Sequence, residues 1–478
     1  MKKWVLFLTL GGFFLRLFFL TKHEFWFDEA FSYFLARLPV SSLLTATAAD
    51  NNPPLYYLLL KGLLTFRQEI WYLRSLSLVA GTLSIPLVYL IARQWRFEKA
   101  VAVLSTLLFT LSPLIVYFST ETRMYQLLVF EGLLIVYAFN ILSEKKSFLP
   151  SLLFVGIGIA GIYTHYYFFI LLFLLFLSVL TRQSERRYPG YWILMNLFIG
   201  ISFLPWLPFY FSFEHPGCWC FPPAIGFPAT LASFFVNGVG VSTFRTFLLL
   251  PHFMLFQLLL VAGTLLLLTL IPFRTVLREK SMQMPLSLVI GSFSLVVAVS
   301  LFRPFFSPRA FLLIAPFFYM LTGFSVYEVV HRSFRFASIL LIILLGSVLL
   351  LFATEKSFYG QPLKESEQFV SSSFQEGDRI SHTSVYTFYS YQYFSPEKKQ
   401  YLTLQAPLSP DTISLIGGYA DPIESVILQG GRLWFIHFPE WTPISKAEET
   451  KLMLARHFQL ITMKRFGSIE VWLFQLTP

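Results

Sequence analysis

Charged residues are scarce in this sequence. They make up 13% of its 478 residues, whereas hydrophobic residues make up 56% and the mean hydropathy is +0.64. A soluble domain carries about 25% charged residues. The chain therefore lacks the polar surface of a water-soluble protein, and its apolar surface requires lipid.

Cysteine is nearly absent as well. Cys218 and Cys220 are separated by one residue, which is too close for an easy disulfide. With His215 they offer three soft ligands but no fourth, so neither a disulfide framework nor a structural zinc site is predicted.

Motifs for nucleotide chemistry are also missing. The sequence has neither a Walker-type phosphate loop nor the glycine fingerprint of dinucleotide-binding folds. The net charge of +10 is spread over the gaps between apolar runs rather than gathered in one tail. We therefore expect neither a nucleotide-driven reaction nor a nucleic-acid partner.

The chain does have long apolar runs. A helix crosses a bilayer with about 17 to 25 apolar residues, and eleven segments fit, at residues 4–20, 72–92, 100–118, 124–142, 148–164, 167–181, 191–211, 251–272, 285–302, 310–329 and 336–353. Lysine and arginine gather in alternate gaps, which the positive-inside rule makes cytoplasmic. The sequence predicts a multi-pass protein of the inner or plasma membrane with its C-terminus outside.

The composition divides the chain into two domains. Residues 1–354 form the predicted transmembrane domain, and an outer loop at 21–71 carries a short helix that begins at Pro53 and Pro54. Residues 355–478 are polar and form a predicted extracytoplasmic α/β domain. Its expected strands lie at 379–381, 433–437 and 469–473, and its expected helix at 447–457.

An acidic pair, Asp28 and Glu29, follows the first apolar run among aromatic residues. A carboxylate in such surroundings tends toward a raised pKa, which suits a general base. The alternative is a pair of ordinary solvated loop acids.

Other polar residues lie in segments that the predicted topology places outside. Each has a plain structural alternative: a helix cap for Asp50 or Asn52, an ion-paired or snorkelling side chain for Arg123, and an aromatic neighbour for His165. The full set of candidates is Asp50, Asn52, Tyr56, Glu121, Arg123, Tyr125, His165, Tyr166, Arg303 and Arg309.

The order of these segments carries a resemblance. The sequence contains Phe27-Asp28-Glu29-Ala30, then Asp50-x-x-Pro53-Pro54-Leu55-Tyr56-Tyr57, Glu121-x-Arg123-Met124-Tyr125, Thr164-His165-Tyr166-Tyr167 and Pro308-Arg309. This series resembles the bacterial protein mannosyltransferase and aminoarabinose transferase branch of the GT-C glycosyltransferases, which is similar to glycosyltransferase family 39. The resemblance implies an α-helical polytopic membrane protein of the GT-C type, with about 11 transmembrane helices and a small C-terminal α/β domain.

The resemblance also implies an activity. Such enzymes transfer a sugar with inversion from a polyprenyl-phosphate carrier to a lipid, envelope glycan or protein acceptor on the outer face. Asp28 would be the base and Glu29 its neighbour, while Arg123, Arg303 and Arg309 would bind the donor phosphate. The remaining candidates would bind substrate, and Asp28 and Asp50 could hold a divalent cation, Mg²⁺ or Mn²⁺.

The sequence differs from the family's motifs at one position, and two other functions are also considered. Related aminoarabinose transferases often have lysine just before the Pro-Pro pair, where this chain has Asn52, which puts the donor's identity in doubt. A transporter or flippase for an anionic or lipid-linked substrate would also explain the outer arginines, although no pair of broken helices marks an inverted repeat. An envelope scaffold that acts through its tail is the third possibility.

Overall fold

The computed structural model describes residues 2–181, 189–213, 273–302, 309–332, 361–403, 423–427, 431–438 and 444–476. Its contacts divide the chain into two compact units. The first comprises Met1–Leu20, Asn51–Leu59 and Trp71–Glu355, and the second comprises Thr21–Asp50, Leu60–Ile70 and Lys356–Pro478. The predicted outer loop at 21–71 is thus shared between the two units.

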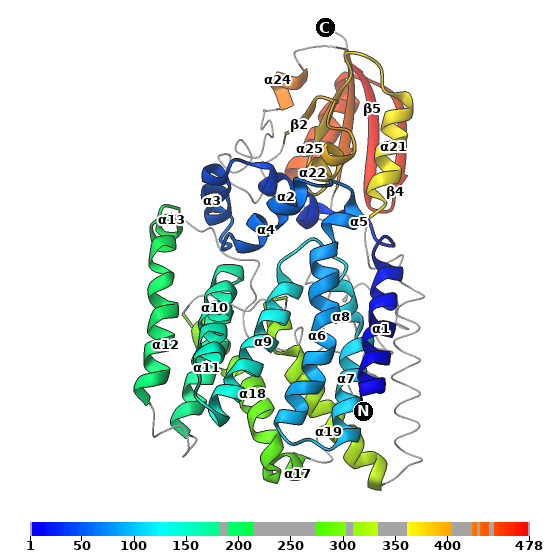
Figure 1. Cartoon of the computed structure of the whole chain (residues 1–478). Coiled ribbons are helices and arrows are strands. Elements are labelled where there is room, and N and C mark those ends of the chain that lie inside the picture. The colour runs from blue at the N-terminus through cyan, green and yellow to red at the C-terminus, as the bar shows by residue number, and fades with distance from the viewer. Residues whose placement is uncertain are drawn as a thin grey trace. The chain divides into compact units, whose positions relative to one another are not determined.

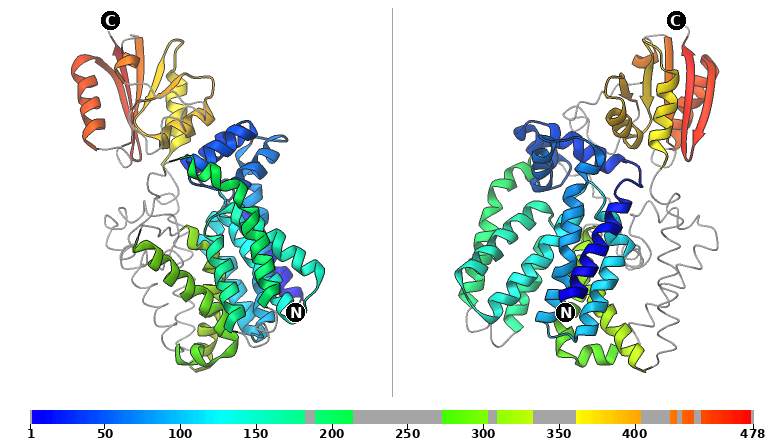
Figure 2. Two further views of the ribbon diagram at one scale, coloured as in Figure 1. Left: turned by 90° about the vertical axis from the view of Figure 1, so that its left-hand side faces the viewer. Right: turned by 45° about the vertical axis from the view of Figure 1, so that its right-hand side comes forward.

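The first unit is a helical bundle (Figures 1 and 2). Within it α6 packs against α9, α7 against α19, and α10 against α9. Its helices are α1 (Lys2–Phe19), α6 (Ser75–Gln94), α7 (Lys99–Leu111), α8 (Pro113–Phe118), α9 (Tyr125–Glu144), α10 (Phe148–Thr164), α11 (Phe168–Thr181), α12 (Pro189–Ser202), α13 (Leu207–Phe211), α17 (Phe273–Arg278), α18 (Gln283–Ser300) and α19 (Ala315–Arg332), with short 3₁₀ turns at Leu204–Trp206, Lys280–Met282 and Ala310–Ile314.

The bundle has the surface of a membrane protein. Among the described residues, five helices are long and apolar enough to cross a membrane: Ser75–Gln94, Tyr125–Glu144, Pro189–Phe211, Lys280–Ser300 and Phe311–His331. Large apolar side chains such as Phe7 and Phe18 of α1 are 67% and 61% exposed, so lipid must cover them. Each predicted crossing in the described ranges coincides with helix, whereas those at 251–272 and 336–353 lie outside the described residues.

The predicted crossing at 100–118 is broken. Helix α7 ends at Leu111 and α8 begins at Pro113, because proline lacks an N–H and is accommodated only in the first turn of a helix. Ser112 caps α8 by accepting a hydrogen bond from the N–H of Ile115 at 3.3 Å. Two shorter helices therefore replace the single one that apolar content alone suggests.

Arg16, the cation inside the first span, is fully buried beside this break. Its Nε donates to Ser119 Oγ at 3.0 Å, and its Nη1 donates to the carbonyls of Gly12 at 3.0 Å and Thr110 at 3.4 Å. The guanidinium therefore satisfies a carbonyl near the end of α7, which accounts for a charge that lipid would not tolerate.

The second unit contains a five-stranded sheet in the order β2-β1-β3-β5-β4. Strand β1 (Arg379–His382) pairs in parallel with β2 (Gln400–Leu402) and β3 (Gly431–His437). Strand β5 (Ile469–Leu476) is antiparallel to both β3 and β4 (Gln459–Phe466). The two-residue turn between β4 and β5 uses Gly467 at φ +56°, a conformation that glycine adopts without strain.

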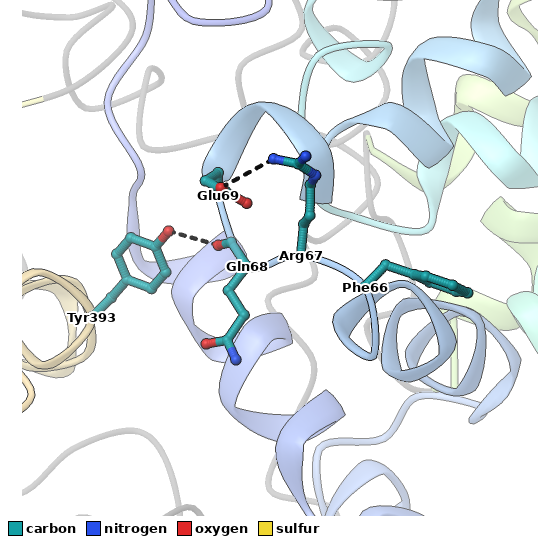
Figure 3. Close-up of a pocket in the computed structure, with 5 residues that line it drawn as sticks. All are labelled: Phe66, Arg67, Gln68, Glu69 and Tyr393. Carbon is teal, nitrogen blue, oxygen red and sulfur yellow. Dashed lines mark hydrogen bonds and ion pairs between the residues drawn. The ribbon is translucent and has the colours of Figure 1, made fainter.

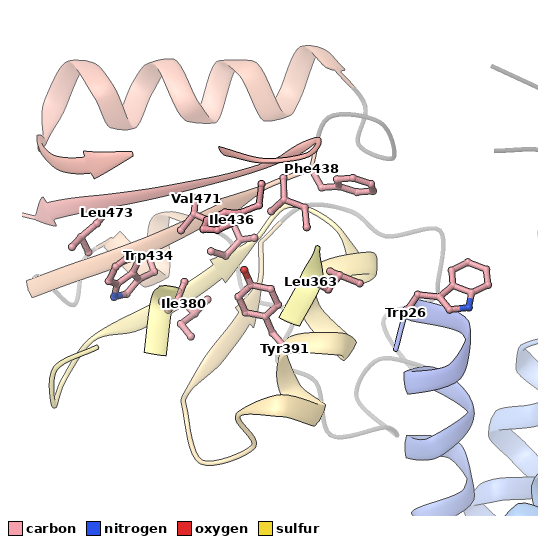
Figure 4. Close-up of a cluster of buried hydrophobic side chains, with 12 residues drawn as sticks. Trp26, Leu363, Ile380, Tyr391, Trp434, Ile436, Phe438, Val471 and Leu473 are labelled. Atoms are coloured by element: carbon pink, nitrogen blue, oxygen red, sulfur yellow. The ribbon is translucent and has the colours of Figure 1, made fainter. Parts of the chain in front are cut away.

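Helices cover both faces of this sheet. Trp434 and Ile436 of β3 pack with α21 (Leu363–Ser373) and α22 (Val385–Phe394) in the core drawn in Figure 4. Leu433 and Phe435 pack on the other face, with α24 (Ile423–Ile427) and α25 (Ile444–His457). Alternate β3 side chains thus enter opposite layers, as the two-residue period of a strand requires.

The predicted strands at 379–381, 433–437 and 469–473 and the helix at 447–457 are confirmed. The prediction missed β2, which has three residues, and β4, whose side chains are exposed along most of its length and so show no buried alternation.

Candidate functional site

The acidic pair lies in a helix rather than in a loop. Helix α2 (Phe27–Arg37) begins directly before Asp28 and Glu29, so both carboxylates occupy its first turn. The unpaired N–H groups and the dipole of a helix stabilise negative charge at this end. Asp28 is 8% exposed and Glu29 fully buried, so the alternative of ordinary solvated acids is wrong.

Both acidic residues are held by neighbours in the second unit. Ser32 Oγ donates to the carbonyl of Asp28 at 2.8 Å, one helical turn along α2. His23 Nδ1 lies 3.9 Å from Glu29 Oε2, so a protonated His23 would form an ion pair with it. These contacts hold the first turn of α2.

An aromatic layer joins α2 to helix α22, which also belongs to the second unit. The ring of Tyr389 lies 6.0 Å from that of Phe27 and 5.8 Å from those of Phe31 and Phe34, measured between centroids. These three phenylalanines follow one face of α2, because residues spaced by three or four share a side of a helix. Helix α22 therefore supports the helix that carries the acidic pair.

Asp50 ends α3 (Val40–Ala49) as its C-cap residue, and its N–H donates to the carbonyl of Ala46. Burial first, and the charge of Asp50 second, raise the pKa of Tyr389. Helix α4 (Leu55–Leu64) confirms the predicted short helix. Its first hydrogen bond runs from Leu58 N–H to the carbonyl of Pro54, and Asn52 is half-buried in the first unit.

The second unit also has an open hollow of about 600 Å³ (Figure 3). Tyr393 donates from its hydroxyl to the carbonyl of Gln68 at 2.9 Å, and Arg67 pairs with Glu69 at 3.6 Å. Phe66 completes the lining. The hollow contains none of the predicted site residues.

In the first unit, Arg123 lies two residues before the first residue of α9 and is 7% exposed. Its Nη1 donates to the hydroxyl of Tyr57 at 3.3 Å, and its guanidinium carbon lies 6.0 Å from the ring centroid of Tyr125. Ser77 Oγ donates to the carbonyl of Arg123 at 3.3 Å. The guanidinium is thus held by a hydrogen bond to Tyr57 and by the aromatic face of Tyr125.

His165 lies next to Tyr125, the residue whose ring contacts the Arg123 guanidinium. The rings of Tyr125 and His165 lie 6.0 Å apart, and His165 Nδ1 accepts a hydrogen bond from the N–H of Tyr167 at 3.1 Å. In the neutral ring the proton is therefore on Nε2, which can donate to a ligand. Tyr166 instead accepts from Trp206 Nε1 at 3.1 Å.

Two further candidates of the first unit are buried. Glu121 is fully buried and its Oε1 accepts from the hydroxyl of Tyr117 at 3.4 Å. Tyr56 is also fully buried, and its ring lies 5.8 Å from that of Tyr57.

The contacts of Arg123 with Tyr57 and Tyr125, and of Tyr125 with His165, join these four residues in one cluster. Tyr57 was not among the predicted site residues.

Two other arginines, Arg303 and Arg309, were predicted to bind the donor phosphate. Arg309 is half-buried and begins the 3₁₀ turn at Ala310–Ile314, whereas Arg303 lies outside the described residues. The convergence of three arginines on one anion therefore stays a prediction.

The predicted cation would bind through carboxylates of the second unit. Within the described ranges, no group of three or more histidine, cysteine, aspartate or glutamate side chains is placed to hold a metal ion. The cation prediction thus depends on Asp28 and Asp50 alone.

Gln126 was missed as a candidate. It is fully buried in the first turn of α9, and neither its amide nitrogen nor its amide oxygen has a hydrogen-bond partner among the described residues. The available signal was a polar side chain at the start of an apolar run, directly after Arg123 and Tyr125.

The apolar bundle and the covered α/β sheet define a multi-pass membrane protein with a small C-terminal sheet domain. Residues 51–209 match the model of the dolichyl-phosphate-mannose-protein mannosyltransferase family. Over these residues the match agrees with the resemblance drawn from the motifs. No curated protein matches it in sequence.

Solved structures share the fold. The crystal structure of ArnT from Cupriavidus metallidurans in the apo state is similar with a TM-score of 0.63 and 12% identity, over 99% of this chain and 98% of that one. ArnT bound to undecaprenyl phosphate gives 0.61 and 10%, over 99% and 98%. The Archaeoglobus fulgidus oligosaccharyltransferase tethered with an acceptor peptide gives 0.50 and 11%, over 100% and 74%.

Proposed function

We propose that the protein is an inverting glycosyltransferase that moves a sugar from a polyprenyl-phosphate carrier to a lipid, envelope glycan or protein acceptor. The observation that carries the proposal is a buried acidic pair on α2 in a chain that shares its fold with ArnT. ArnT has been crystallised with undecaprenyl phosphate bound, which supports a lipid-phosphate donor here as well.

In this proposal Asp28 accepts the proton of the acceptor hydroxyl while that oxygen attacks the anomeric carbon of the sugar. The bond between the anomeric carbon and the phosphate oxygen breaks, and polyprenyl phosphate leaves with the electron pair. One displacement inverts the anomeric configuration. Glu29, fixed beside Asp28 in the same turn, orients the acceptor hydroxyl.

The leaving phosphate gains negative charge, which a preorganised cation stabilises. Arg123 suits this role because Tyr57 and Tyr125 already hold its guanidinium. Arg303 and Arg309 are proposed as further phosphate contacts. Asp50, Asn52, Tyr56, Glu121, Tyr125, His165 and Tyr166 are proposed to bind substrate.

The proposal includes a location and a cation. The chain would lie in the inner or plasma membrane with its C-terminal domain outside, as the alternation of lysine and arginine predicts. Mg²⁺ or Mn²⁺ would bind through Asp28 and Asp50, because carboxylate oxygens are the ligands such ions prefer.

A test is a screen of lipid-linked sugars with purified protein in detergent, analysed by mass spectrometry. We expect the donor to be consumed and polyprenyl phosphate to form, because a transferase needs neither a gradient nor a second compartment. A flippase would leave the lipid-linked sugar intact, and that result would exclude the proposed reaction.

A further inference from the structure

Gln126 has an unusual environment for a buried amide. Its side chain is fully buried, and within the described part of the chain neither Oε1 nor Nε2 forms a hydrogen bond. Burying a polar group without a partner costs free energy, and native structures nearly always provide one. A partner supplied by a ligand would explain why the residue is kept polar.

The side-chain amide of Asn140, on the same helix, provides a comparison because its hydrogen bonds are satisfied. Near the other end of α9, Asn140 Oδ1 accepts from Trp95 Nε1 at 3.1 Å, and its Nδ2 donates to Gln94 Oε1 at 3.0 Å. Both halves of this amide are thus satisfied by neighbouring side chains. The contrast indicates that the missing partners of Gln126 are specific to the outer end of the helix.

That end of α9 favours an anion. The helix has 20 residues, and its N-cap residue Met124 makes no side-chain capping bond. The first backbone N–H groups and the helix dipole attract negative charge. Arg123 adds a full positive charge two residues before the first residue of the helix. Because helical side chains lean toward the N-terminus, we expect the Gln126 amide to lie over this first turn.

The hydrogen-bonding groups of the amide restrict the class of ligand that can satisfy it. An amide offers a donor and an acceptor at once. A bare phosphate anion would satisfy only Nε2, whereas the junction of a sugar and a phosphate supplies an acceptor oxygen and a donor hydroxyl side by side.

We infer that Gln126, together with the N-terminus of α9 and Arg123, binds the sugar-phosphate junction of the lipid-linked donor. Nε2 donates to a phosphate oxygen and Oε1 accepts from a sugar hydroxyl. This inference rests on the proposed function, because it takes the ligand to be the donor of that reaction.

The experiment compares Gln126→Met with Asn140→Leu in the full-length protein in detergent. Methionine keeps the volume and helix preference of glutamine but cannot replace its hydrogen bonds. We expect Q126M to unfold at the wild-type temperature or higher, because it removes an unsatisfied buried amide, and to bind undecaprenyl phosphate about tenfold more weakly. N140L should unfold at a lower temperature and bind undecaprenyl phosphate as the wild type does.

Undecaprenol, which has the same tail without phosphate, is the ligand control. Its binding should be equal in wild type and Q126M. With the lipid-linked sugar that the transfer screen identifies, Q126M should lose more affinity than with undecaprenyl phosphate. Equal losses would remove the sugar contact from the inference.

Two results would overturn the site. Unchanged binding of undecaprenyl phosphate by Q126M would show that no phosphate contact exists, and a loss of stability like that of N140L would show that Gln126 is structural. Failure of the proposed function looks different: the wild type would bind undecaprenyl phosphate through Gln126 yet transfer no sugar.

Discussion

Arg123 donates a hydrogen bond to the hydroxyl of Tyr57 at 3.3 Å, across 66 positions of sequence. This contact joins two motifs that the sequence presents only in order, the Pro-Pro-Leu-Tyr-Tyr segment and the Glu-x-Arg-Met-Tyr segment. It assigns a positioning role to Tyr57, because the tyrosine hydroxyl orients the Arg123 guanidinium, the cation that the proposed reaction requires.

Replacing Tyr57 by phenylalanine should therefore weaken the reaction without unfolding the protein. Loss of a hydrogen bond to a charged group predicts a fall of about tenfold in kcat/KM for the lipid-linked donor. Tyr89→Phe is the matched control, since the buried Tyr89 hydroxyl has no hydrogen-bond partner among the described residues. Equal kinetics for Y57F and Y89F would contradict the role of Tyr57.

Gly81 should not tolerate a side chain. A Cβ there would lie 2.7 Å from Ser119 Cβ and 3.2 Å from Arg16 Nε, so Gly81→Ala displaces the hydrogen bond between Ser119 and Arg16. We expect a loss of about 1–3 kcal/mol in unfolding free energy, measured by thermal or denaturant unfolding in detergent. Gly11→Ala meets nothing within 4 Å, and helix propensity predicts an unchanged or higher stability. Similar effects of the two substitutions would refute this packing.

The second unit should lose stability in acid through His382. Burial lowers the pKa of this histidine to about 3, and its ring lies in hydrogen-bond range of Thr387 and Gln400. In the unfolded chain the ring takes up a proton near pH 6.5. The unfolded state therefore binds more protons, and the stability that the neutral ring contributes is lost as pH falls from about 6.5 toward 3.

Thermal unfolding at pH 7 and pH 5 tests this titration. His382→Gln cannot titrate in this range, so its unfolding temperature should fall less between the two pH values than that of the wild type. A fall as large as that of the wild type would assign the acid sensitivity to other groups.

Chelation should reduce sugar transfer if Asp28 and Asp50 hold the predicted divalent cation. We expect activity to drop with EDTA and to return with Mg²⁺ or Mn²⁺, and Asp50→Asn to need a higher concentration of the ion. Full activity in EDTA after exhaustive dialysis would remove the cation from the mechanism.

Much of the fold was predictable because its causes are local. The apolar run at 124–142 predicted α9 (Tyr125–Glu144) closely, because a helix that crosses a bilayer needs an apolar segment as long as the hydrocarbon core is thick. The break at Ser112 was also visible in Pro113, but composition alone does not say whether proline bends a helix or ends it. Strand β4 escaped because its exposed side chains carry no buried alternation.

The candidate site was predictable only in part. Motif order pointed to Asp28 and Arg123, but the helix that carries the acidic pair packs against α22, which follows more than 350 residues later in the sequence. Gln126 was missed for a related reason: a polar residue near the end of a span looks ordinary in the sequence, and only the structure shows that its amide has no hydrogen-bond partner among the described residues.

The most direct test of the central claim is single-turnover sugar transfer by Asp28→Asn beside the wild type, with the anomeric configuration of the product read by NMR. Asparagine keeps the size of the side chain at the start of α2 but cannot accept the proton as a carboxylate does. The proposed mechanism predicts an inverted product from the wild type and a loss of at least about a hundredfold in rate for D28N, with expression and unfolding temperature close to normal. Full transfer by folded D28N, or a product with retained configuration, would contradict it.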